Sequence, residues 1–286
     1  MTIEKLGRTV EAQGLTLATE AFGDPGHPPA LLIMGAMASM LWWPDAFCEG
    51  LARQGRYVIR YDNRDTGLST TYAPGSPPYA MEDMADDAMM ILDAYDIASA
   101  DLIGMSMGGM IAQLAAFRHP ARVRTLTLIS TSPVGVEVAD VPPMSEAYIE
   151  HGEAGSKVDW SDPGQVADYI VREAALIAST RHPHDEAAAR AFIEADIARA
   201  TNFASGTNHF LAEKREKWEG AVAALPMPVL VIHGTSDPVF PVEHGLQFAA
   251  SLPGTPVLTV DGGGHELHPM DRAAMLDAIG SHLTAG

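Results

Sequence analysis

Short apolar runs that alternate with helical patterns are the feature that most constrains this chain. Each run is rich in β-branched or aliphatic residues and is bounded by glycine, proline or aspartate, which is typical of fully buried strands in a parallel sheet. Six such runs occur, at residues 30–35, 56–62, 100–105, 123–130, 227–234 and 255–264. Helical patterns occur between or after them, at residues 81–95, 109–120, 242–253 and 270–283. This alternation predicts an α/β protein with a mostly parallel, twisted sheet flanked by helices.

Residues 134–220 interrupt the alternation, because they contain no buried-strand signal. Four stretches in this region have amphipathic helical patterns, and they begin near residues 142, 162, 184 and 208. We therefore expect a helical cap, or lid, over 134–220 that is inserted late in the sheet. Residues 1–133 and 221–286 would then form one core domain.

The segment Gly104-Met105-Ser106-Met107-Gly108 directly follows a predicted strand and directly precedes a predicted helix. A serine on such a tight turn has strained backbone angles, and side chains two residues before and after it would collide with the turn. The turn lifts the hydroxyl clear of the sheet and aims the N–H of Met107 at the same point. The same pattern can be a plain glycine turn, but its position between strand and helix favours a nucleophile at Ser106.

Composition excludes several kinds of partner. The net charge of −19 argues against nucleic acid and anionic membranes, which both bind clustered Lys and Arg. Cys48 is the only cysteine, so no intramolecular disulfide can form. The N-terminal residues lack the basic and apolar regions of a signal peptide, and no apolar run reaches the about 18 residues of a membrane span. We expect a cytoplasmic protein and leave its oligomeric state open.

Six motifs together resemble the α/β-hydrolase superfamily. They cover nearly the whole chain and are "ALLIMG", "DNRDTGLS", "GMSMGGM", "HPARVRTLTLIS", "HGTSDPVFP" and "GGGH". The combination of "IRYDNRDTGLST" with Met-Gly, where many relatives have His-Gly, is similar to aclacinomycin methylesterase-like small carboxylesterases. The segment "GMSMGGMIAQLAA" is equally similar to 3-oxoadipate enol-lactonases and cofactor-free haloperoxidases. The resemblance implies an α/β-hydrolase fold and a serine hydrolase that needs no cofactor.

A serine hydroxyl needs a base, and the resemblance implies the chain order nucleophile, acid, histidine. His265, in "DGGGHELHP", has the expected place in a loop after the last predicted strand. His268 is the nearest alternative, but beside Pro269 it is more typical of a helix start. The histidines show no metal-ligand spacing with a second group of acids or cysteines, so we expect no metal ion.

Asp237 is the predicted acid, because it follows the strand-ending Gly234 and precedes a helix. A helix-capping aspartate is the alternative role for this residue. Some relatives have the acid after the preceding strand instead, where Glu137 is the candidate. Asp261 is a further alternative, but it is too close to its strand end to orient His265 from behind.

Two backbone N–H groups are the expected donors to an oxyanion. The first is that of Met107. The second belongs to Ala36, in the loop after "ALLIMG", where the missing histidine leaves open what braces the loop. For Asp62, Arg64 and Asp65 we favour a buried Asp–Arg pair that braces the loop beside the site over a catalytic role.

Apolar side chains on the two loops that flank Ser106 predict an adaptable pocket wall. Those we assign to the wall are Met34, Met37, Trp42 and Met105. No basic residue is obviously placed to hold a substrate carboxylate. This pattern favours fairly apolar substrates.

We predict a carboxylic ester hydrolase that uses Ser106, His265 and Asp237 and an acyl-enzyme intermediate on small to medium esters. Four alternatives stay open: an enol-lactonase, a hydrolase of carbon–carbon bonds in ring-cleavage products, a perhydrolase, and a non-catalytic ligand-binding protein of the same fold. In the carbon–carbon hydrolases a tryptophan commonly follows the catalytic histidine, whereas this chain has Glu266. Haloalkane dehalogenases and epoxide hydrolases of this fold are excluded, because they have aspartate in place of Ser106.

Overall fold

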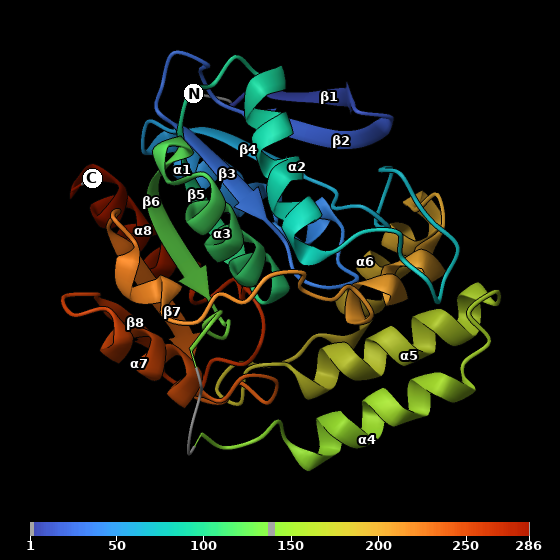
Figure 1. The fold of residues 1–286 in the computed structure, drawn as a ribbon. Helices are drawn as coiled ribbons and strands as arrows, with labels where there is room; N and C mark the ends of the chain where they lie inside the picture. Colours follow the sequence, from blue (N-terminus) through green and yellow to red (C-terminus); the bar gives the residue numbers. More distant parts are fainter. Residues whose placement is uncertain (1–2, 137–140, 286) are drawn as a thin grey trace.

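The computed structural model describes residues 3–136 and 141–285 and contains an eight-stranded sheet (Figure 1). The strand order is β1-β2-β4-β3-β5-β6-β7-β8. Strands β3 to β8 run parallel, whereas β2 pairs antiparallel with both β1 and β4. The strands are β1 (Lys5–Ala12), β2 (Leu15–Phe22), β3 (Pro29–Ile33), β4 (Tyr57–Tyr61), β5 (Ala100–Met105), β6 (Val123–Ile129), β7 (Val229–Gly234) and β8 (Val257–Val260).

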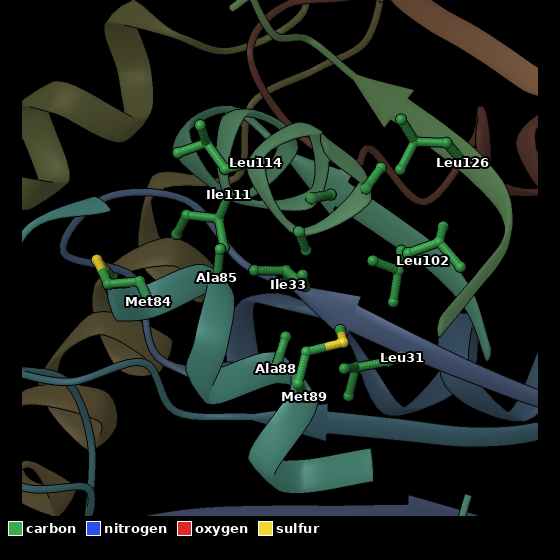
Figure 2. Close-up of a cluster of buried hydrophobic side chains, with 14 of the residues drawn as sticks. Leu31, Ile33, Met84, Ala85, Ala88, Met89, Leu102, Ile111, Leu114 and Leu126 are labelled. Carbon is green, nitrogen blue, oxygen red and sulfur yellow. The ribbon is translucent and has the colours of Figure 1, made fainter. Parts of the chain in front are cut away.

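Helices cover both faces of this sheet, which gives three layers (Figure 1). On one face lie α2 (Met81–Ala94), α3 (Met107–Arg118) and α7 (Val242–Ser251), and on the other α1 (Asp45–Arg53) and α8 (Arg272–Ala285). Figure 2 shows how apolar side chains of α2 and α3 meet those of β3, β5 and β6. Within the two described ranges, no helix combines the length and the apolar character of a bilayer span.

All six predicted strands and all four predicted core helices are present, but the sequence reasoning missed the hairpin of β1 and β2. Gln13 and Gly14 form its two-residue loop with φ of 53° and 79°, the left-handed values of a type I′ turn. Most residues of β1 are exposed, so this strand lacks a continuous apolar run. Helix α1 was also missed, although Phe47, Cys48 and Leu51 have helical spacing and are buried.

Among the described residues between β6 and β7 there are three α-helices, namely α4 (Glu146–Ala154), α5 (Pro163–Leu176) and α6 (Glu186–Arg199). Helices α5 and α6 pack through a cluster of their own, which contains Ile170, Val171 and Ile193. The prediction of a fourth helix from residue 208 is wrong. Two 3₁₀ helices, η4 (Phe203–Phe210) and η5 (Ala221–Ala224), flank an irregular segment instead.

The irregular segment finds its hydrogen-bond partner on α2 rather than within a helix of its own. The backbone N–H groups of Arg215 and Glu216 and the indole N–H of Trp218 donate to the Glu82 carboxylate over 3.1–3.2 Å. The Trp218 ring also stacks on Phe117 of α3, with centroids 5.5 Å apart. A charged acceptor and an aromatic platform on the core therefore outweigh the local helical tendency of these residues.

Candidate active site

The parallel strands bring the predicted site residues to one edge of the sheet. Ala36, Ser106, Asp237 and His265 each follow the carboxyl end of a strand, respectively β3, β5, β7 and β8. Strands β3 and β5 are neighbours, and the chain order of the strands changes direction between them. Open α/β sheets bind their ligands beyond the carboxyl ends of the strands at such a point. Ala36 follows β3 on one side of this point, and Ser106 follows β5 on the other.

Ser106 has a strained backbone at the junction of β5 and α3, with φ of 54° and ψ of −127°. Its N–H donates to the Ile129 carbonyl at 3.0 Å, and its carbonyl accepts the Thr131 hydroxyl at 2.7 Å. A Cβ on Gly108 would lie 2.1 Å from the Ile33 carbonyl oxygen, and one on Gly104 would lie 2.3 Å from the Gly108 oxygen. The turn therefore requires both glycines that flank the serine.

Asp237 and His265 meet at this edge, since His265 Nδ1 lies 2.8 Å from Asp237 Oδ2. The other carboxylate oxygen, Oδ1, accepts the N–H groups of Val239 and Phe240 at 2.9 Å each. Asp237 is not the helix cap of α7, whose N-cap is Pro241. The carboxylate is thus held in one orientation from its own loop and faces the imidazole.

The charge of Asp237 is stabilised despite its burial. Burial alone would raise the pKa of this carboxyl, but the positive charge that His265 carries when protonated, its hydrogen bond, the charge of a protonated His233 and the Phe240 N–H together hold the pKa below its usual value. An ionised carboxylate against Nδ1 keeps the ring proton on that atom and leaves Nε2 as the basic nitrogen. Within the described residues, Ser106 Oγ and His265 Nε2 have no hydrogen-bond partner.

The alternative acids and histidine have other surroundings. Asp261 is exposed and pairs with Arg181 at 3.2 Å. Glu137 lies outside the described residues. The ring of His268 stacks on that of His182, with centroids 4.5 Å apart. Of the candidates in the described ranges, Asp237 and His265 are the two that the structure brings into contact.

The loop with Ala36 runs directly beside Ser106. A Cβ on Gly35 would lie 3.0 Å from the Ser106 Cβ and 3.4 Å from its Oγ, so glycine permits this close approach. Met107 is the first residue of α3, where backbone N–H groups have no partner within the helix. Of the predicted donors, Ala36 thus follows the glycine that lies against Ser106, and Met107 follows the serine in the first turn of α3. Their role as oxyanion donors stays a prediction.

The expected buried Asp–Arg pair is present, but Asp62 and Arg64 each pair with a residue outside this segment, and Asp65 accepts the Tyr79 hydroxyl at 2.6 Å. Asp62 is fully buried and pairs with Arg199 of α6 at 2.7 Å, and it also accepts the Met40 N–H at 2.8 Å. Arg64 pairs with Asp87 of α2 at 2.5 Å instead. Asp62 does brace the loop beside the site, as expected, but its partner is 137 residues away in the chain and has no local signal.

The four predicted pocket residues divide into two pairs. Met34 and Met105 belong to the buried cluster on the α1 and α8 side of the sheet. Met37 and Trp42 pack against the cluster of α5 and α6, and the Trp42 indole N–H donates to Asp196 at 3.0 Å. A cavity of about 380 Å³ between α5 and α6 shares no lining residue with the Ser106 site. The role of these side chains as a pocket wall stays a prediction.

Two residues between β6 and β7 that sequence reasoning missed lie near the acid and the imidazole: Tyr148 interacts electrostatically with Asp237, and Glu173 with His265. Glu173 of α5 accepts the Tyr148 hydroxyl of α4 at 2.9 Å. Burial raises the pKa of Glu173, while the hydrogen bond from Tyr148 and the positive charge that His265 carries when protonated lower it in part. Their positions depend on how α4 and α5 pack, and no motif in the sequence indicates them.

One group within the described ranges has the composition of a metal site. The ligand atoms of His182, His268 and Asp271 all lie within 4.8 Å of one another. His182 Nε2 already contacts Asp271 Oδ1 at 2.9 Å, and His268 Nδ1 accepts the Met270 N–H at 3.2 Å. Hydrogen bonding accounts for this arrangement, and the absence of a metal ion stays a prediction.

Comparisons with known proteins show which family this chain resembles. Residues 28–270 match the model of the alpha/beta hydrolase fold family. Rhodomycin D methylesterase of Streptomyces sp. (strain C5) is 30% identical over 97% of this chain and 98% of its own. A 2-hydroxymuconate semialdehyde hydrolase of Pseudomonas sp. (strain CF600) is 28% identical over 86% of this chain and 82% of its own.

Among solved structures, the esterase RhEst1 from Rhodococcus sp. ECU1013 superposes with a TM-score of 0.78. It covers 100% of this chain and 99% of its own at 20% identity, which shows a shared fold. The prediction of an α/β-hydrolase fold is confirmed, and the methylesterase relatives support a carboxylic ester hydrolase. With the family model matched over 28–270 and a relative 30% identical over nearly the whole length, the chain belongs to the alpha/beta hydrolase fold family.

Proposed function

We propose that this protein is a serine carboxylesterase that hydrolyses small to medium, fairly apolar esters. The observation that carries the proposal is the contact of His265 Nδ1 with Asp237 Oδ2 at 2.8 Å, at the sheet edge where Ser106 has its strained turn. The similarity to rhodomycin D methylesterases supports ester hydrolysis as the reaction.

In the proposed mechanism, Ser106 Oγ attacks the ester carbonyl carbon while His265 Nε2 takes its proton. The carbonyl oxygen becomes an oxyanion that accepts the N–H groups of Ala36 and Met107. His265 then gives the proton to the leaving alkoxide, and an acyl-enzyme remains. Water, deprotonated by the same imidazole, attacks the acyl carbon and releases the acid and Ser106.

Asp237 contributes to this mechanism through the imidazole. Its carboxylate accepts the Nδ1 proton, holds the ring in the tautomer with a basic Nε2, and stabilises the imidazolium formed in each half-reaction. Because the backbone N–H groups of Val239 and Phe240 fix Oδ1, Oδ2 stays directed at the ring.

We further propose that residues 134–220 act as a cap over the site and that 1–133 with 221–286 form the catalytic core. The cap helices α5 and α6 pack on Met37 and Trp42 of the loop beside Ser106, which supports this division. Substrate would then bind between these apolar side chains and the serine. No cofactor or metal takes part in the mechanism that we propose.

The nucleophile is tested with a fluorophosphonate probe. We expect the wild-type protein to be labelled and Ser106→Ala to remain unlabelled at equal fold content by circular dichroism. A p-nitrophenyl ester panel should give turnover in the wild type alone. Equal labelling of the two proteins would overturn the assignment of Ser106.

Cleavage of a carbon–carbon bond is the second candidate, because 2-hydroxymuconate semialdehyde hydrolases are among the relatives. The same purified protein should be assayed against a ring-fission dienoate and against p-nitrophenyl esters. We expect kcat/KM to be higher for the esters. A preference for the dienoate would make this second candidate the function, and peroxide-dependent bromination above ester turnover would indicate a perhydrolase.

A further inference from the structure

A histidine of the 3₁₀ helix η4 holds the loop beside Ser106. The N–H of Met37 donates to His209 Nδ1 at 3.0 Å, and His209 Nε2 lies 2.7 Å from the Arg64 carbonyl oxygen. His209 is 4% exposed, so both contacts are shielded from solvent. Met37 directly follows Ala36, which supplies one of the two proposed oxyanion donors.

The two contacts specify one protonation state of the ring. A backbone N–H can only donate, so Nδ1 must accept and carries no proton. Nε2 then carries the ring proton and donates it to the Arg64 carbonyl. Burial lowers the pKa of His209, which favours this neutral form. His209 is therefore a fixed acceptor for the Met37 N–H.

Met37 needs such an anchor because of its backbone. Its φ is 60°, a left-handed value that side-chain-bearing residues adopt at a cost. η4 packs closely against it, since a Cβ on Gly206 would lie 3.2 Å from the Met37 Cα. The strained conformation sets the direction of the peptide that follows Ala36, and through it the course of the loop.

η4 is itself fixed to the core. The Asn208 side-chain amide donates to Asp65 Oδ2 at 3.0 Å and to the Ala73 carbonyl at 3.1 Å, and its oxygen accepts the Gly75 N–H at 2.8 Å. Asn208 is fully buried. His209 thus extends from a rigid support rather than from a free surface turn.

We infer that His209 is a positioning residue for the oxyanion hole, and that it orients the Ala36 N–H through Met37 without touching the substrate. This chain has Met34-Gly35 at a place where a loop histidine is common in the superfamily, and His209 supplies an imidazole to the same loop from a distant segment. The inference rests on the proposed function, because it assumes that Ala36 donates to an oxyanion.

Two amide substitutions separate the two ring contacts. His209→Asn has an oxygen near the position of Nδ1 and can still accept the Met37 N–H, whereas His209→Gln has its amide near Nε2 and loses that contact. We expect His209→Gln to lower kcat roughly 10- to 100-fold with little change in KM. The Ala36 N–H would be misplaced, and its hydrogen bond to the oxyanion matters mainly in the transition state. His209→Asn should restore most of the loss.

A tetrahedral-adduct inhibitor gives a readout that a merely structural role would not change. The inhibition constant of a trifluoromethyl ketone should rise in His209→Gln by the same factor by which kcat/KM falls. His282→Asn is the matched control. It also removes a buried imidazole, whose Nε2 lies 3.2 Å from the Leu126 carbonyl oxygen, but His282 is on α8 and, among the described residues, has no hydrogen bond to the loop of Ala36. It should leave kcat unchanged.

The outcomes distinguish this inference from the proposed function. Equal kcat and equal inhibition constants in His209→Gln, His209→Asn and wild type, with Ser106→Ala inactive, would overturn the role of His209 and leave the esterase intact. Equal fluorophosphonate labelling of Ser106→Ala and wild type would instead show that the proposed function itself fails.

Discussion

The Ser179 backbone N–H donates to Glu266 Oε1 at 2.7 Å, and this bond ties the segment after α5 to the loop of His265. The His265 N–H donates to the Ile177 carbonyl at 2.8 Å, and the Thr180 N–H donates to the Gly262 carbonyl at 2.9 Å. A Cβ on Gly264 would lie 2.1 Å from the Ile177 oxygen, so the two segments touch. The histidine loop is therefore shaped by the segment after α5 as well as by β8.

Replacement of Glu266 should loosen this attachment. We expect Glu266→Ala to lower kcat several-fold, up to about tenfold, because the imidazole loses part of its alignment with Ser106. Glu266→Gln retains an acceptor for the Ser179 N–H and should stay close to wild type. Steady-state kinetics of both variants, with melting temperatures as a check on folding, measure the effect. Wild-type kcat in Glu266→Ala would show that the other hydrogen bonds between the two segments are enough to hold the His265 loop.

Asp237→Asn should lower kcat by about 10³- to 10⁴-fold. The N–H groups of Val239 and Phe240 hold Oδ1, so the new amide nitrogen would take the place of Oδ2 and donate to His265 Nδ1. The ring would then carry its proton on Nε2, where it cannot accept the Ser106 proton.

The exposed acid Asp261 provides the comparison for Asp237→Asn. Asp261→Asn removes only the exposed pair with Arg181 and should keep wild-type kcat/KM. The reverse pattern, with Asp261→Asn inactive and Asp237→Asn active, would assign the acid to Asp261. Normal activity in both variants would turn attention to Glu137.

The parallel strands β3 to β7 could be predicted from the sequence because they are buried on both faces and therefore form continuous apolar runs. The hairpin of β1 and β2 could not be found in this way, since most of β1 is exposed. The strand ends then placed Ser106, Asp237 and His265 at one edge, because parallel strands share the direction of their carboxyl ends.

The braces around these residues could not be predicted, because their partners are distant in the chain. Asp62 contacts Arg199, Met37 contacts His209 and Ser179 contacts Glu266, and the partners are 137, 172 and 87 positions apart in the sequence. The packing of the segments between β6 and β7 on the rest of the fold brings them together. The same packing explains why the segment after residue 210 is irregular and not the predicted helix. Its backbone N–H groups donate to the Glu82 carboxylate instead.

Gly108→Ala should severely destabilise the fold. The added methyl would lie 2.1 Å from the Ile33 carbonyl oxygen, which is backbone of a central strand and cannot move aside cheaply. We expect the free energy of unfolding to fall by at least about 2–3 kcal/mol. Gly152→Ala is the control: nothing lies within 4 Å of its added Cβ in α4, so it should stabilise by about 0.5–1 kcal/mol. Urea denaturation measures both, and an equal midpoint for Gly108→Ala and wild type would contradict the tight turn.

Acid should destabilise the protein through its buried histidines. Burial lowers the pKa of His233, which is fully buried, below the ordinary value of 6.5. Above pH 6.5 the ring is neutral in both states, so its contribution to stability is complete. As the pH falls below 6.5, the unfolded chain binds a proton that the folded chain does not, and stability is lost until the folded pKa is reached.

The stability lost through His233 is measured as the difference between wild type and His233→Gln. We expect the free energy of unfolding to fall between pH 7.5 and 5.5 by about 1 kcal/mol more in wild type than in His233→Gln, since one proton is worth about 1.4 kcal/mol per pH unit. The difference removes the shared contribution of the carboxyl groups, and Asp237, whose pKa is lowered, loses its stabilising charge only at still lower pH. Urea titrations at the two pH values provide the four free energies. Equal losses in the two proteins would mean that His233 takes up its proton as readily in the folded state as in the unfolded one.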